Sequence, residues 1–376
     1  MITLNFVAEW DKTDRSLTWS GTTLALYEAL QKYFNVYDID VTAHLMTPND
    51  ILLTKLKRKL HIKEKDDFGV RRNKAAEQYI HSLKMDSNTP QVYFQFAEIV
   101  RDNKKRQTYI FQDLSVDFLC HQYENNPDIF ALGNFKEATI NTMIKRRKIQ
   151  NSYYKNCMGV FTLGKWTHDD MINRMGIPSN KVHHVGGGIN ISSELIDSSR
   201  KEGNKILFIG RDFERKGGHL VVEAFSLLRK KMPKAQLYIA GSTTNPITRY
   251  IDGVIFLGSL DRKQVSEAYN MCDVFCMPSY FEPYGLVFIE ALTYGLPCIG
   301  RNCQEMPYFI EEGVTGSLID NDNPETLSQK MYECLTNEAI KKNVFNMSEY
   351  YMKEYNWDTV AQKIYDTIQM DLQNYK

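Results

Sequence analysis

Short apolar runs alternate with amphipathic helical patterns in the second half of the chain. Each run ends in glycine or a small polar residue, or is closely followed by one, which is typical of buried strands. The runs are ILFI at 206–209, QLYIAG at 236–241, VIFLGSL at 254–260, VFCMPS at 274–279 and PCIGR at 297–301. Segments 219–230 and 261–271, which lie between them, carry the helical patterns. This alternation predicts a parallel, doubly wound α/β sheet with ligands at the carboxyl ends of its strands.

The first half of the chain shows the same alternation. Its apolar runs are ITLNFVA at 2–8, VYDIDVT at 36–42, VYFQF at 92–96, TYIFQDL at 108–114 and GVFTLG at 159–164. After the first run, WSGTTLALYEALQKYF predicts a helix with Ser20 as its N-cap and Leu24, Tyr27 and Leu30 on its apolar face. We therefore expect a second sheet of the same kind.

The length of the chain favours two domains, because 376 residues exceed what one hydrophobic core usually serves. The polar segment 191–203 is typical of an interdomain connection. We predict a first domain over 1–192 and a second over 193–357, followed by a last helical pattern over 358–376.

Charge and cysteine content exclude several classes of protein. The 46 basic and 46 acidic residues balance, so nothing indicates a nucleic-acid partner. Seven scattered cysteines without a CxxC pair, and without a second ligand pair beside Cys272 and Cys276, do not form a zinc motif. Free thiols fit a reducing compartment, and the chain shows neither a signal-peptide pattern nor a membrane-spanning run. We therefore expect a cytoplasmic protein.

Two carboxylates stand eight residues apart in SYFEPYGLVFIEALTYGLP, which covers 279–297. They are Glu282 and Glu290. Between them, Gly285 is followed by the apolar residues of a predicted helix, so we expect the helix to begin at Gly285. The start of a helix offers backbone N–H groups and the positive end of its dipole to a phosphate. A carboxylate on each side can accept hydroxyl donors from a sugar. The spacing therefore suits a diphosphate that carries hydroxylated rings at both ends.

This motif resembles the E-x7-E signature of the retaining nucleotide-sugar glycosyltransferases of family 4, which have the two-lobed GT-B fold. The resemblance runs from about Lys205 to Leu318 and continues more weakly through the first half. It implies two Rossmann-like lobes facing a central cleft, with the last helix crossing back to the first lobe. It also implies retaining transfer of a hexose from a UDP- or GDP-linked sugar to a hydroxyl of a glycan, glycolipid or glycoprotein, without a metal or other cofactor.

The resemblance assigns the donor-binding residues. In KILFIGRDFERKGG a strand, a glycine and two spaced cations follow one another, as in many phosphate sites. The family places its diphosphate-binding Arg and Lys at the positions of Arg211 and Lys216. By the same resemblance, Glu282 holds the donor sugar and Glu290 binds the ribose. The remaining donor contacts are the helix amides of Gly285, Leu286 and Val287, and the base-contacting loop Gly258, Ser259 and Leu260.

The first lobe supplies further predicted cleft residues. The family's first strand-to-helix loop faces the cleft, which assigns Ser20 and Gly21 to it, and the domain junction adds Gly187, Gly188 and Asn190. In FQDLS, Gln112 occupies a position where many family members have histidine, and Asp113 follows it. Either side chain reaches the cleft, depending on register. Since glutamine does not titrate, Asp113 is the predicted polar contact to the sugar. No nucleophile stands out, so the family's front-face mechanism is expected.

Two alternatives to a glycosyltransferase remain. One is another enzyme with the same architecture, such as an epimerase or a sugar phosphorylase. The pairing of the two glutamates with Arg211 and Lys216 argues against the epimerase, and the lack of a cofactor-lysine signature disfavours the phosphorylase. The other is a non-catalytic partner subunit, which Gln112 and the sparse glycines near Gly21 favour.

The segment 51–63, ILLTKLKRKLHIK, is basic and amphipathic, and three roles are open to it, one of which is binding to a membrane surface. Leucines recur there at helical spacing, and Lys55, Lys57, Arg58 and Lys59 surround them. Such a helix can lie on an anionic membrane surface. It can equally be a solvated face or a contact surface for a protein partner.

Overall fold

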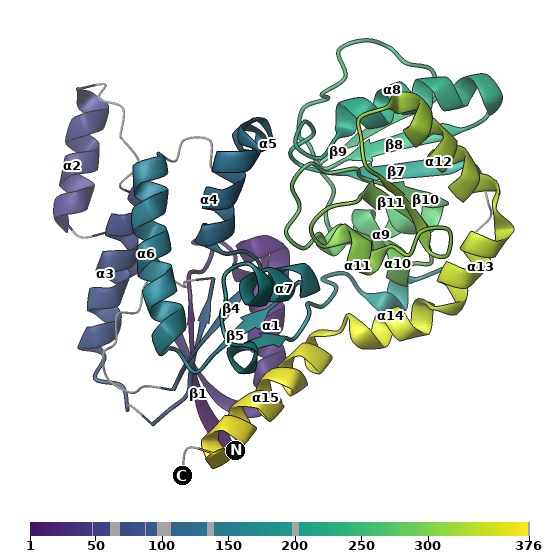
Figure 1. The fold of residues 1–376 in the computed structure, drawn as a ribbon. Helices are drawn as coiled ribbons and strands as arrows, with labels where there is room; N and C mark the ends of the chain where they lie inside the picture. Colours follow the sequence, from purple (N-terminus) through teal and green to yellow (C-terminus); the bar gives the residue numbers. More distant parts are fainter. Residues whose placement is uncertain are drawn as a thin grey trace. The chain divides into compact units, whose positions relative to one another are not determined.

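The computed structural model describes residues 1–46, 48–60, 68–86, 88–95, 107–133, 139–197 and 203–374 (Figure 1). The chain forms two compact units, Met1–Gly187 with Trp357–Lys376, and Gly188–Asn356. The sequence predicts domain boundaries at 192 and 357, and these remain a prediction.

The first unit is built on a six-stranded parallel sheet in the order β2-β1-β3-β4-β5-β6. Its strands are β1 (Ile2–Ala8), β2 (Phe34–Asp40), β3 (Gln91–Phe94), β4 (Thr108–Gln112), β5 (Gly159–Thr162) and β6 (Val182–His184). Its helices are α1 (Thr22–Leu30), α2 (Pro48–Lys59), α3 (Phe68–Ser82), α4 (Val116–Asn125), α5 (Pro127–Leu132), α6 (Ile140–Asn156), α7 (Lys165–Asn173) and α15 (Trp357–Asn374), with short 3-10 turns η1 (Arg15–Gly21), η2 (Thr42–His44) and η3 (Ser179–Lys181).

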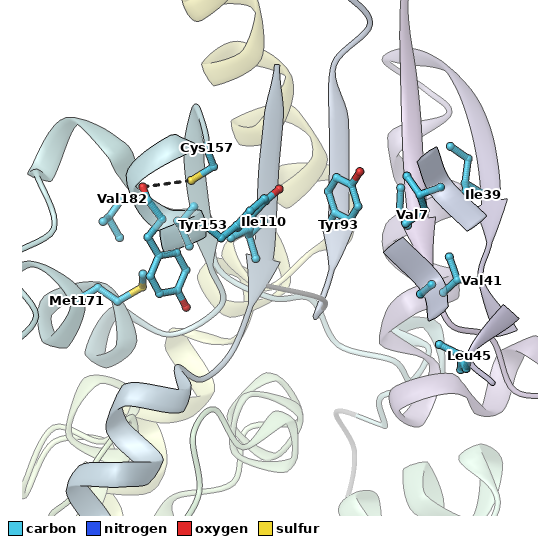
Figure 2. Packing of buried hydrophobic residues seen from close by; sticks show 14 residues of the cluster. Val7, Ile39, Val41, Leu45, Tyr93, Ile110, Tyr153, Cys157, Met171 and Val182 are labelled. Carbon is cyan, nitrogen blue, oxygen red and sulfur yellow. Dashed lines mark hydrogen bonds between the residues drawn. The ribbon is translucent and has the colours of Figure 1, made fainter. Parts of the chain in front are cut away.

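Apolar side chains from strands and helices form one buried core in this unit. Figure 2 shows Val7, Tyr93 and Ile110 of the central strands in one cluster with Tyr153, Cys157 and Met171. The Cys157 thiol donates to the Tyr154 carbonyl at 3.6 Å. Burial raises the pKa of this thiol to about 12, so it stays protonated. Every residue of the central strands β3, β4 and β5 is buried, so both faces of the sheet are covered there.

The second unit contains another six-stranded parallel sheet, ordered β12-β11-β10-β7-β8-β9. Its strands are β7 (Lys205–Ile209), β8 (Gln236–Ala240), β9 (Val254–Gly258), β10 (Val274–Cys276), β11 (Cys298–Arg301) and β12 (Gly316–Ile319). Its helices are α8 (Gly218–Lys231), α9 (Arg262–Met271), α10 (Leu286–Thr293), α11 (Met306–Phe309), α12 (Pro324–Thr336), α13 (Glu338–Asn346) and α14 (Ser348–Glu354), with the turn η4 (Ser193–Leu195).

The predicted strands are present in both units, although residue 96 of the run 92–96 lies outside the described residues. The sequence did not reveal β6 and β12, which are edge strands of three and four residues. The prediction of Ser20 as a helix N-cap is wrong. Helix α1 begins at Thr22 with Gly21 as its N-cap, because Gly21 takes a φ of 94° at no steric cost. The fully buried face of α1 carries Leu26 and Leu30, while Leu24 and Tyr27 are half-buried.

The last helix, α15, packs on the first unit beside α1. Lys32 pairs with Asp358 at 2.6 Å, and the Tyr109 hydroxyl donates to Asp371 at 2.8 Å. Its buried side chains follow helical spacing and include Val360, Ile364 and Ile368.

Candidate functional site

The strand order of the second unit defines a switch point between β7 and β10. From β7 the chain winds outward through β8 and β9, and it then returns to the other side of β7 to form β10, β11 and β12. In open sheets of this kind, ligands bind outside the carboxyl ends of the two strands where the order reverses. The loops that follow β7 and β10 therefore border the predicted ligand crevice.

Glycines bring these two loops into close contact. A Cβ on Gly210 would lie 2.6 Å from Cδ of Lys216, and one on Gly217 would lie 2.6 Å from the Pro278 carbonyl oxygen. Gly217 also has a φ of 75° and caps α8. Only glycine allows the lysine stem and the second loop to approach the backbone so closely.

Lys216 and Glu282, both predicted as donor contacts, meet at the switch point. The Lys216 ammonium lies 2.9 Å from Oε2 of Glu282, and the Arg215 guanidinium lies 3.6 Å from the same oxygen. All three side chains are largely enclosed, with exposed fractions of 13–14%. The structure thus places two cations and one carboxylate within reach of a single ligand.

Two neighbours of Glu282 were not anticipated from the sequence. The Arg215 guanidinium donates to the Phe281 carbonyl, and the Arg215 carbonyl accepts from the Tyr280 N–H at 3.0 Å. Gln304 accepts from the Glu282 N–H through Oε1 at 3.2 Å. These contacts hold the loop that carries Glu282 on both sides. No sequence pattern signals them, because they join segments far apart in the chain.

Helix α10 begins at this loop. Gly285 is its N-cap with a φ of 85°, which confirms the prediction that Gly285 opens a helix. A Cβ on Gly285 would lie 3.0 Å from Cγ of Glu282, so the carboxylate side chain packs against the helix start. The first-turn amides of Leu286 and Val287 precede any helical carbonyl that could accept from them. They are therefore suited to bind an anion beside Lys216.

Glu290 lies one turn further along α10 and is buried, with 6% of its surface exposed. Its Oε1 accepts from the Asn190 N–H at 3.4 Å, and Oε2 accepts from the Tyr269 hydroxyl at 3.3 Å. Burial raises the pKa of Glu290 to about 7, against the opposing effect of these two hydrogen bonds. The structure thus brings the predicted residues Asn190 and Glu290 together.

The other predicted donor residues occupy the same edge of the sheet. Arg211 is exposed and follows Gly210 directly. Gly258 ends β9 with a φ of 76°; Ser259 is exposed and Leu260 is half-buried. Gly188, which was predicted to line the cleft, is buried, two residues before Asn190.

In the first unit, the structure distinguishes Gln112 from Asp113. Gln112 is 1% exposed, and its amide accepts from the Tyr154 hydroxyl at 2.9 Å and donates to the Met171 sulfur at 3.5 Å. The prediction that Gln112 contacts a sugar disagrees with this placement, because its side chain is bonded inside the core. Asp113 is half-buried just past the end of β4. Ser20 is exposed beside Gly21, in the loop between β1 and α1.

The described residues include no group of three or more His, Cys, Asp or Glu side chains placed to hold a metal ion. None of the helices in the described ranges has the length and apolar character needed to cross a membrane.

Comparisons with known proteins place this geometry in a class. The sequence model of the family described as "Glycosyl transferases group 1" matches residues 194–353. An uncharacterized glycosyltransferase of Methanocaldococcus jannaschii is 26% identical over 236 residues, which cover 56% of this chain and 60% of the relative. Sucrose-phosphate synthase from Thermosynechococcus elongatus superposes with a TM-score of 0.67 at 16% identity over 100% of both chains. Anabaena HepE, solved in complex with UDP and glucose, gives 0.65 at 14% identity over 98% of this chain and 100% of the other.

Two parallel six-stranded sheets and full-length likeness to these structures define a protein of the GT-B fold. The match of residues 194–353 to the group 1 glycosyltransferases confirms the predicted resemblance for the second unit. The chain spans about half the length of the curated relatives it matches, from 46% to 60% for the first three.

Proposed function

We propose that this chain is a retaining glycosyltransferase that moves a hexose from a nucleoside diphosphate sugar to an acceptor hydroxyl. The observation that carries the proposal is the Lys216–Glu282 pair at the switch point, in contact with the start of α10. A diphosphate fits the lysine and the helix amides, and the hydroxyls of its attached sugar fit the carboxylate. The bound UDP and glucose of Anabaena HepE make a UDP-linked hexose the first donor to test.

Each residue then has a defined task. Arg211, Lys216 and the amides of Leu286 and Val287 stabilise the negative charge that grows on the departing diphosphate. Glu282 holds the sugar hydroxyls and orients the anomeric carbon, and Asp113 adds a polar contact from the first unit. In the front-face route, the bond from the anomeric carbon to the diphosphate oxygen breaks, and the acceptor oxygen bonds on the same face. The acceptor proton leaves with the diphosphate.

On the base side of the donor, the proposal uses Glu290 and the end of β9. Glu290 accepts hydroxyl donors from the ribose, in place of the Asn190 and Tyr269 donors that contact it. Gly258, Ser259 and Leu260 lie at the carboxyl edge of the sheet, two strands from β7, and are assigned to the base.

Thermal unfolding in the presence of UDP, GDP, ADP, dTDP and their sugar conjugates tests the donor site. A ligand at 100 times its Kd adds about 2.7 kcal/mol to the free energy of unfolding. We expect one base to stabilise the protein. Arg211→Ala should weaken that nucleotide by roughly 1.5–3 kcal/mol, since it removes a charge-assisted contact. Lys230→Ala is the matched control, because Lys230 is exposed in the last turn of α8.

Thermal unfolding and turnover assays together separate the alternatives. A non-catalytic partner subunit without a donor site predicts no stabilisation by any nucleotide. An epimerase predicts a new nucleotide sugar without release of nucleoside diphosphate, and a sugar phosphorylase predicts turnover only with inorganic phosphate. Equal binding by wild type and Arg211→Ala would refute the role assigned to Arg211.

We also propose that α2 docks on an anionic membrane surface, where a glycolipid acceptor would be available. Leu52, Leu53, Leu56 and Leu60 are 67%, 45%, 53% and 59% exposed. Lys55 and Lys59 are exposed among them, while residues 61–63 of the predicted segment lie outside the described residues. An apolar stripe bordered by cations fits anionic headgroups above an acyl layer. This assigns the protein to the cytoplasmic face of the plasma membrane.

Sedimentation with vesicles of neutral lipid, or of neutral lipid mixed with anionic phosphatidylglycerol, tests this surface. We expect salt-sensitive binding to the anionic vesicles only. Lys55→Glu/Lys59→Glu should abolish it, since each cation contributes roughly 1 kcal/mol near the surface and each charge reversal adds repulsion. Leu83→Ser changes an exposed leucine directly after the end of α3 and should leave binding unchanged. Binding that ignores both salt and the lysine reversal would refute the proposal.

A further inference from the structure

The first unit has a switch point of its own, between β1 and β3. In the order β2-β1-β3-β4 the chain passes from β2 on one side of β1 to β3 on the other. By the same rule as in the second unit, the crevice outside the carboxyl ends of β1 and β3 is the place for a ligand. The loop that follows β1 and the last residue of β3, Phe94, border this crevice.

Trp19 in this loop is exposed at that point. Its indole is 54% exposed and packs at 75° on the ring of Phe94, with 6.4 Å between ring centroids. Phe94 is buried and stacks on Phe111 at the end of β4, at 5.3 Å. By contrast, Trp10 and Trp357 are buried and Trp166 is half-buried. Trp19 is therefore a large apolar surface that rests on the core and is open to solvent.

The backbone holds Trp19 in an unfavourable conformation. Trp19 has φ 49° and ψ 44°, Ser20 has φ 58°, and Gly21 continues the left-handed run at φ 94°. Two successive non-glycine residues in this region each cost on the order of 1–3 kcal/mol. Neighbouring contacts maintain the turn: the Thr22 N–H donates to the Trp19 carbonyl, and the Asp11 N–H donates to the Thr18 hydroxyl at 2.8 Å. The indole is thus fixed in position.

The loop that carries the exposed ring, DKTDRSLTWS, is rich in polar residues. Asp11, Thr13, Asp14 and Ser20 are all exposed in this loop. A pyranose ring combines an apolar C–H face with a rim of hydroxyl groups. An aromatic face among carboxylates and hydroxyls matches both features. An acyl chain would find no other aliphatic side chain here except Leu17, which is also exposed.

We propose that Trp19 is an acceptor-binding platform on which a pyranose ring of the acceptor stacks, so that the acceptor is a glycoside. The proposal rests on the glycosyl transfer proposed above. It places the acceptor ring at the switch point of the first unit. Asp113 lies at the end of β4, the strand next to β3.

Tryptophan fluorescence tests the platform directly. Methyl α- and β-glycosides of glucose, galactose, mannose and N-acetylglucosamine are titrated into the full chain, with and without the nucleotide that stabilises it. We expect one of them to shift the emission saturably in the wild type and not in Trp19→Phe. With that glycoside as acceptor, Trp19→Ala should raise its KM about tenfold, because a stacked aromatic contact is lost.

Leu17→Ala is the matched control, because it removes an exposed apolar side chain from the same loop. Thermal unfolding of each variant shows that it is folded. Glycosides that leave the emission unchanged, or a Trp19→Ala variant with unaltered acceptor KM, would overturn the platform while nucleotide stabilisation kept the proposed transfer intact. Loss of all nucleotide response in the wild type would instead refute the transfer.

Discussion

Glu282→Gln is expected to reduce release of nucleoside diphosphate from the donor sugar about 100-fold or more while nucleotide affinity stays nearly constant. The substitution keeps the shape of the side chain and removes its charge. In the structure that charge lies 2.9 Å from Lys216 and beside the start of α10. It is therefore placed to act on the sugar next to the diphosphate, where losing one preorganised electrostatic contact costs roughly 10²–10³ in rate. The rate is measured by coupled detection of nucleoside diphosphate, and affinity by calorimetry.

Glu267→Gln is the control for this experiment, because Glu267 is exposed on α9. Lys216 and Arg215 lose their common partner in Glu282→Gln, which can lower the stability of the fold. Thermal unfolding of the variant measures that loss. A folded Glu282→Gln variant with a rate near that of the wild type would remove Glu282 from the mechanism.

The second large expected effect is a change of folding stability with pH, which Glu290 causes. The pKa of Glu290 is about 7 in the folded chain, against an ordinary value of 4.5, because burial disfavours its charged form. Between these values the folded state holds a proton that the unfolded state has released, so stability falls as pH rises through this window. The stabilising contribution, roughly 3 kcal/mol, is complete below pH 4.5 and lost above pH 7.

Glu290→Gln removes this titration. Urea unfolding at pH 5 and pH 8 should therefore show that the variant gains stability relative to the wild type at the higher pH. Glu267→Gln should show no such change. Parallel pH profiles for wild type and Glu290→Gln would mean that Glu290 is ionised across the whole range.

Features carried by local pattern could be predicted from the sequence. The long apolar strands, the helix that opens at Gly285 and the family itself follow from periodicity and motif. Edge strands β6 and β12 did not, because VHH and GSLI hold too few apolar residues to form an apolar run, whereas the equally short β10 reads VFC. The start of α1 was misplaced because Ser20 is a good N-cap by residue type, yet the tertiary structure holds it in a left-handed turn.

The site residues divide in the same way. Lys216 and Glu282 stand in recognisable motifs, and the structure brings them into contact. Arg215 and Gln304 have no local signature, since they act through contacts that join the loop after β7, the loop after β10 and the segment after β11. Gln112 and Asp113 are neighbours in a strand end, where one residue of register decides which side chain enters the core. Only packing against Tyr154 and Met171 settles it.

The position of α15 in the first unit sets the order in which a nascent chain can finish folding. The second unit comes from one uninterrupted stretch, Gly188–Asn356, whereas the first needs the final segment Trp357–Lys376. On the ribosome, the partners of α15, such as Phe34 beside Tyr365 and Tyr109 beside Asp371, are made long before the helix that covers them. Amino-terminal domains generally fold first during synthesis. Here the last folding step of the first unit follows the synthesis of the second unit, because α15 is made after it. A stop codon before position 357 would remove α15 and leave the side chains that it covers in the first unit exposed to solvent.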